Sequence, residues 1–97
     1  MAKRSSRQQT KHEEGVQSSA EYYESQGFNV QADIQGYPKP KTIGGRRPDL
    51  IATKGRETVI IEHETLDSLQ KDEDQRETFK DYADTHNGVR FRTRVVK

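Results

Sequence analysis

Apolar residues recur along the chain with two different periods, and their order predicts a mixed α/β fold. Val16, Ala20 and Tyr23 stand at i, i+4 and i+7, which is one face of an amphipathic helix. Gly27 follows and is typical of a helix end. The segment FNVQADI (28–34) then alternates apolar and polar residues, which predicts a strand.

The segments DLIATK and ETVIIEHE flank Gly55-Arg56 and predict a β-hairpin. A two-residue turn with glycine in first position is typical of such hairpins. This turn sets a register in which Lys54 faces Glu57 and, further along the ladder, Asp49 faces Glu62. Both faces of the hairpin carry aliphatic residues, so we expect it to be the centre of a sheet that is covered on both sides.

A second helix is predicted from apolar residues that end before Asn87-Gly88, and a final strand from the alternating segment VRFRTRVV (89–96). The apolar residues of that helix are Leu66, Leu69, Phe79, Tyr82 and Ala83. The predicted order is α-β-β-β-α-β. We therefore expect an α/β fold in which two helices flank a four-stranded mixed sheet, with residues 13–97 forming a single domain.

Composition narrows the class of protein. The 97 residues are 28% hydrophobic and 34% charged, so the core must be small. The absence of cysteine excludes disulfides, zinc–thiolate sites and iron–sulfur clusters. No apolar run approaches the length of a membrane span, so we expect a cytoplasmic protein without a membrane partner.

Charge is strongly segregated although the net charge is only +1. Residues 1–12 carry four bases and no acid, and we expect them to form a flexible basic arm. The loop 35–48 and the last nine residues are also basic, whereas residues 13–34 carry acids alone. Such zones could bind phosphates around a metal site, or they could be ordinary solvated charge.

Three carboxylates meet at one end of the predicted hairpin. Glu64 shares a face with Glu62 because side chains alternate along a strand, and the register brings Asp49 opposite them. Like charges this close repel and raise a pKa unless a cation compensates. Mg²⁺ suits such a site, and a bound metal can assist phosphodiester hydrolysis. The alternative is that these acids only decorate strand ends.

The PDLIA segment, its spacing to IIEHE and the order of elements resemble the PD-(D/E)XK nuclease superfamily, which includes restriction endonucleases and archaeal Holliday junction resolvases. The resemblance covers about residues 13–96. It implies an endonuclease that depends on Mg²⁺ (or Mn²⁺), acts on DNA and can form a homodimer, with Asp49 and Glu62 as catalytic metal ligands. Gln75 is similar to the glutamine of the Q-x-x-x-Y pattern in RecB-like members and implies a contact at the nucleic-acid site, although Phe79 replaces the tyrosine.

Glu64 departs from this family pattern, which places a lysine there. Glu64 could be a third metal ligand or a base, or the basic role could have moved to Lys71 or Lys80. Catalysis could also have been lost. The resemblance further implies Glu14 of the first helix as an additional metal ligand, although acids are also favoured near a helix N-terminus for electrostatic reasons.

The basic loop runs directly into Asp49, so its cations are candidate phosphate ligands. They are Lys39, Lys41, Arg46 and Arg47. Two other functions stay open: a non-catalytic nucleic-acid-binding module on the nuclease fold, and a protein-interaction domain that uses the acidic second helix (Asp67, Asp72, Glu73, Asp74, Glu77). We expect His63 to be packed or hydrogen-bonded, and His12 and His86 to lie on the surface.

Overall fold

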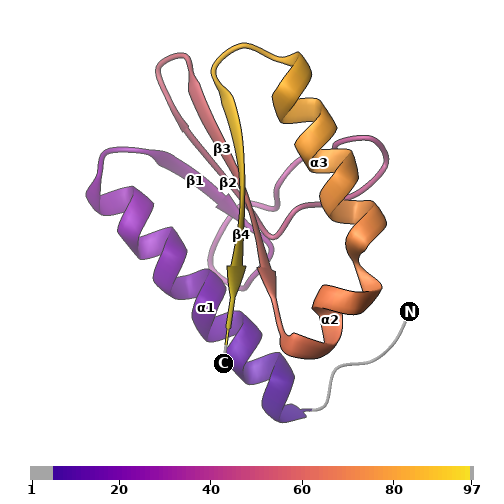
Figure 1. Ribbon diagram of the computed structural model, residues 1–97. Coiled ribbons are helices and arrows are strands. Elements are labelled where there is room, and N and C mark those ends of the chain that lie inside the picture. Colours follow the sequence, from indigo (N-terminus) through magenta and orange to yellow (C-terminus); the bar gives the residue numbers. More distant parts are fainter. Residues whose placement is uncertain (1–5, 97) are drawn as a thin grey trace.

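The computed structural model describes residues 6–96, apart from the side chains of residues 6–9 and Asp67. The elements are α1 (Ser6–Ser25), β1 (Asn29–Ala32), β2 (Leu50–Lys54), β3 (Glu57–Glu64), α2 (Leu66–Lys71), α3 (Glu73–Thr85) and β4 (Val89–Val95). The predicted α-β-β-β-α-β order and the four-stranded mixed sheet are confirmed (Figure 1). The fold is therefore that of a restriction endonuclease-like α/β core.

Helix α1 is longer than the sequence pattern indicated. We expected a flexible arm over residues 1–12, whereas the helix already begins at Ser6. Residues 1–5 of that predicted arm lie outside the described residues. The extension has a tertiary reason, because it brings His12 onto the buried face of the helix, four residues before Val16.

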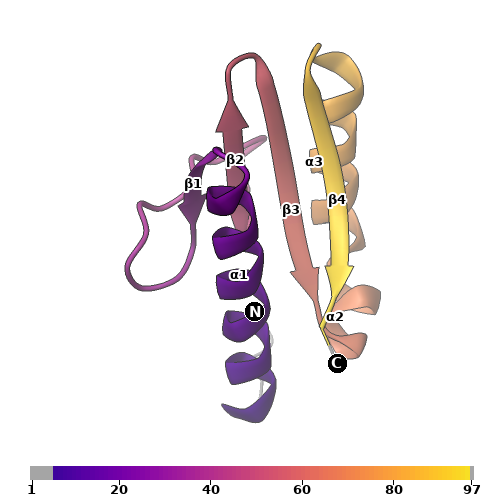
Figure 2. The same ribbon diagram turned by 90° about the vertical axis from the view of Figure 1, so that its left-hand side faces the viewer.

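The four strands lie side by side in the order of the sequence, as Figure 2 shows. β1–β2 and β2–β3 are antiparallel pairs, and β3–β4 is parallel. Gly55 has a φ of 59°, as the first position of a type II′ hairpin turn requires. The predicted register is confirmed, since Lys54 pairs with Glu57 and Leu50 with Ile61. Asp49 therefore stands just before the first paired residue of β2.

The sheet is covered on both faces, by α1 on one side and by α3 on the other (Figure 1). On the α1 face, Val16 and Ala20 pack on aliphatic residues of β2 and β3. On the α3 face, Phe79 packs with Ile51 and Ile60. Alternation along β3 consequently directs Glu62 and Glu64 to the α3 face and His63 to the α1 face.

The predicted second helix is divided into two. Thr65 caps the start of α2 through a reciprocal capping box with Ser68, and Asp72 separates α2 from α3. The Asp72 amide donates to Ser68 O at 2.9 Å, and Asp72 O accepts from Arg76 N at 3.1 Å. The chain changes direction at this break, and the first turn of α3 then lies against the end of β3.

Candidate active site

Asp49 is held at the end of the sheet by contacts from α1, from β3 and from the segment after β1. Its Oδ2 accepts a hydrogen bond from His63 N at 2.7 Å and lies 3.2 Å from His12 Nε2 of α1. Its backbone amide donates to Glu62 Oε1 at 3.0 Å, and its carbonyl accepts from Asp33 N at 2.8 Å. The structure thus joins the predicted Asp49–Glu62 pair, through the Asp49 amide.

Glu62 is a nearly buried carboxylate with both oxygens engaged. Oε1 accepts from the Asp49 amide, and Oε2 accepts from Gln75 Nε2 of α3 at 3.0 Å. Burial, and then the charge of Asp49, raise the pKa of Glu62 to about 9. Ionising Glu62 beside Asp49 is therefore unfavourable in the protein alone, and a bound cation would relieve the repulsion between the two charges.

Glu64 shares the α3 face with Glu62, as predicted, but it has partners of its own. Ser68 Oγ donates a short hydrogen bond to Glu64 Oε2, and Arg76 Nη1 lies 3.7 Å from Oε1. The side chain is fully buried, and this burial raises the pKa of its carboxyl group. The structure therefore engages Glu64 with α2 and α3.

The described residues contain no group of three or more histidine, aspartate or glutamate side chains arranged to hold a metal ion. The predicted cluster of three carboxylates is thus a pair, Asp49 and Glu62, with Glu64 set apart by its own contacts. The pair still suits a hard divalent cation, because a cation would compensate the two negative charges when both groups are ionised.

Two histidines flank Asp49 on the α1 side. His63 is packed and hydrogen-bonded, as predicted, whereas the surface position expected for His12 is wrong, because His12 is 5% exposed. Ser19 Oγ lies 2.7 Å from His63 Nε2 and accepts from Arg94 Nη1 at 2.9 Å. The Ser19 hydroxyl can therefore donate to Nε2, which leaves the imidazole proton on Nδ1, 3.8 Å from Asp49 Oδ2.

Burial lowers the pKa of His63 to about 4, so the ring is neutral near pH 7.

The sequence analysis assigned no site role to His12, although a signal existed. His12, Val16, Ala20 and Tyr23 follow one another at helical spacing, and extending the apolar stripe by one turn would have placed His12 on the buried face.

The other predicted site residues fall in different places. Gln75 contacts Glu62 as described above. Glu14 lies on the exposed side of α1, where it lines a shallow depression with Glu21 and Ile34. Two residues along a helix turn a side chain to the opposite side, so His12 takes the position towards Asp49 that was expected for Glu14.

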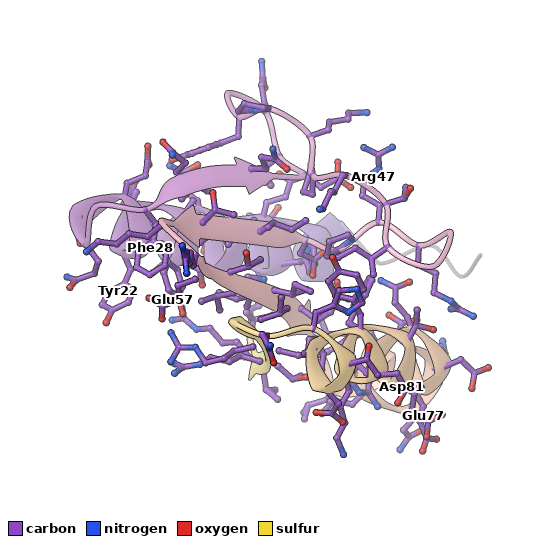
Figure 3. All side chains as sticks on the ribbon, turned by 90° about the horizontal axis from the view of Figure 1, so that it is seen from above. Tyr22, Phe28, Arg47, Glu57, Glu77 and Asp81 are labelled. Carbon is purple, nitrogen blue, oxygen red and sulfur yellow. The ribbon has the colours of Figure 1, made fainter. Side chains whose placement is uncertain are left out.

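The basic loop is an ordered segment that leads into β2. Ile43 and Arg46 form a small bridge, and buried Ile43 packs with the core on the α3 face. Lys39, Lys41 and Arg46 are exposed. Arg47 Nη1 donates to Pro40 O at 3.0 Å, so part of its guanidinium braces the loop (Figure 3).

No helix among the described residues is long and apolar enough to cross a membrane. Asp49 stands before β2, and Glu62-His63-Glu64 (the E-x-E segment) stands at the end of β3. Together with the fold, this arrangement defines a restriction endonuclease-like domain of the PD-(D/E)XK class.

A family model described as AHJR-like, for restriction endonuclease-like proteins similar to archaeal Holliday junction resolvases (REase_AHJR-like), matches residues 3–96. The chain therefore belongs to this family. No curated protein matches the chain. Family membership indicates a nuclease, and a nuclease implies a nucleic acid as substrate.

Proposed function

We propose that this protein is a metal-dependent endonuclease that hydrolyses phosphodiester bonds in DNA. The observation that carries the proposal is the Asp49–Glu62 pair at the end of the β2–β3 hairpin, where burial and mutual repulsion raise the pKa of Glu62 to about 9. Repelling carboxylates of this kind need a cation to be stable when ionised. The family that matches the chain supports the nuclease class.

Asp49 and Glu62 would hold Mg²⁺ (or Mn²⁺), with water and phosphate oxygens as the remaining ligands. The bound ion would lower the pKa of a water molecule and neutralise charge on the phosphate. The chain itself orients the ligands: Gln75 holds Glu62 from α3, while His12 and the His63 amide hold Asp49. Glu64 stands outside this set, because its hydrogen bond and ion pair are with Ser68 and Arg76 rather than with Asp49 or Glu62.

Exposed cations of the loop before β2 would bind the DNA backbone. Lys39, Lys41 and Arg46 are exposed, whereas Arg47 donates a hydrogen bond to Pro40 O within the loop. Phosphate contacts of this kind supply affinity that falls with salt and carry no base sequence information. The homodimer and the cytoplasmic location stay predictions from the sequence.

A second candidate function is a nucleic-acid-binding module that has the nuclease fold without activity. The engagement of Glu64 by Ser68 and Arg76 favours it, because that carboxylate contributes to the fold at a position next to the site. Both functions use the basic loop, so cleavage separates them.

The test uses supercoiled plasmid, a linear duplex, a four-way junction and single-stranded DNA, each with Mg²⁺ or Mn²⁺. Asp49→Asn keeps an acceptor for His63 N but removes the charge, whereas Arg56→Gln is a control at the exposed hairpin turn. We expect cleavage by wild type and Arg56→Gln, and a loss of at least about 100-fold in Asp49→Asn. Salt-sensitive binding without cleavage in any metal would favour the inactive module, and absence of binding at low salt would contradict both functions.

A further inference from the structure

The ion pair between Arg76 and Glu64 has unused hydrogen-bonding capacity. Arg76 Nη1 and Glu64 Oε1 lie 3.7 Å apart, and both atoms are buried without a hydrogen-bond partner among the described residues. Arg76 Nη2 is fixed by a 2.6 Å hydrogen bond to Leu69 O at the end of α2. The guanidinium is therefore oriented on one side and keeps spare donors on the other.

The break at Asp72 places this guanidinium beside Glu64, two residues along β3 from the proposed metal ligand Glu62. Asp72 ends α2, and the first turn of α3 then presents two successive side chains to the end of β3. Gln75 donates to Glu62, and Arg76 pairs with Glu64. One helical turn thus contacts both glutamates of the E-x-E segment.

Arg76 is also accessible from outside. Its side chain is 19% exposed and lines an open depression of about 270 Å³ between α3 and β4. Thr93, which lines the same depression, is the β4 partner of Glu62 in the strand register. The depression therefore lies beside the β4 partner of the proposed metal ligand, and Glu73, Glu77 and Lys80 also line it. A phosphate that enters it would meet the exposed part of the Arg76 side chain.

We propose that Arg76 binds a phosphate of the nucleic acid next to the bond that is cleaved, and that Glu64 is the residue that positions it. This inference rests on the proposed function. Asp49, Glu62 and a phosphodiester bring negative charge to one place, so a fixed cation there stabilises charge that develops during hydrolysis. The planar guanidinium can bind a phosphate while another of its nitrogens stays on Leu69.

Arg76 is a different residue from Lys71 and Lys80, to which the sequence analysis assigned the basic role as alternatives. Lys71 and Lys80 are exposed, and no polar contact that the structure describes fixes their ammonium groups, whereas Arg76 is held by Leu69 and Glu64. A cation that is already oriented loses less freedom when it binds an anion. Glu64 contributes by holding the guanidinium.

The first measurement is phosphate binding, with inorganic phosphate as the probe in the presence of Mg²⁺. Phosphate is titrated into the full chain and followed by NMR of the arginine side chains. We expect binding to weaken roughly tenfold or more in Arg76→Gln and to stay near wild type in Arg56→Gln. Arg76→Lys keeps the charge and should fall between them.

The second measurement is single-turnover cleavage of the best DNA substrate. Arg76→Gln should cleave about 100-fold or more slowly with little change in DNA affinity, because one contact among several is lost from binding. Glu64→Gln should slow cleavage without weakening Mg²⁺ affinity. A metal ligand at this position would instead lower Mg²⁺ affinity, so that result would overturn the positioning role.

The two proposals can fail separately. If wild type cleaves no DNA but phosphate binding depends on Arg76, the nuclease proposal fails and the phosphate site stands. If wild type cleaves and Arg76→Gln matches it in rate and phosphate affinity, the phosphate site is overturned. Should Arg76→Gln not fold, the wild-type NMR titration decides: guanidinium signals of Arg76 that shift as phosphate binds support the site, and signals that stay unchanged overturn it.

Discussion

Replacing Glu62 with glutamine should stabilise the metal-free protein while it removes the metal site. In the folded chain, burial and Asp49 raise the pKa of Glu62 to about 9, compared with 4.5 for the ordinary group. The folded state therefore retains a proton that the unfolded chain releases above pH 4.5. Stability from this group is complete below pH 4.5 and is lost as the pH rises towards 9.

The size of the effect follows from the same shift. Each pH unit between the two pKa values costs about 1.4 kcal/mol, so the loss is about 1 kcal/mol at pH 5 and about 3 kcal/mol at pH 7. Glutamine does not titrate, and its carbonyl can still accept from the Asp49 amide, while its NH2 group can donate to the Gln75 carbonyl once the Gln75 amide turns over. Glu62→Gln should therefore raise the free energy of unfolding by nearly these amounts.

Urea denaturation in EDTA at pH 5 and pH 7 measures this gain. Glu77→Gln is the matched control, because Glu77 is exposed and projects outward from α3 (Figure 3). Adding Mg²⁺ should then stabilise wild type but not Glu62→Gln, because a ligand stabilises only the state that binds it. A destabilised Glu62→Gln at pH 7, or an equal gain at both pH values, would refute the reasoning.

Three further predictions concern other parts of the chain. His63→Gln should be less stable than wild type at pH 7. This difference should shrink by about 3 kcal/mol at pH 4.5, because burial lowers the pKa of His63 from 6.5 to about 4 and wild type loses that stability on acidification. Urea unfolding at both pH values checks this prediction. Gly88→Ala should cost more than about 1 kcal/mol in thermal unfolding, since a Cβ would lie 2.5 Å from Arg56 O at a φ of 78°. Gly36→Ala should cost less, because its φ of 94° is also positive but its Cβ meets no neighbouring atom. Arg46→Gln should reduce the salt slope of DNA binding by about 1, as measured by fluorescence anisotropy.

Much of the fold could be predicted because local rules determine it. The Gly55-Arg56 turn sets the β2–β3 register, and alternation then decides which face each glutamate of the E-x-E segment takes. The helix and strand order followed from two apolar periods. The carboxylate pair was found for the same reason, since its members are related by a short hairpin.

The missed features depend on tertiary contacts. The start of α1 has no apolar repeat of its own, and its helix is completed by the contact between His12 and Asp49, 37 residues away. The break at Asp72 could not be predicted from the sequence, because no glycine or proline lies near it. The contact between Glu64 and Arg76 was missed for the same reason, because that break turns the first turn of α3 towards the end of β3.

The most direct test of the central claim is the rate of plasmid nicking as Mg²⁺ is titrated from zero in EDTA. The Asp49–Glu62 site predicts no nicking without the ion, a rate that saturates as the ion binds, and a rate at least about 100-fold lower at saturation in Asp49→Asn. Nicking that persists in EDTA, or that proceeds equally in Asp49→Asn, would contradict the claim.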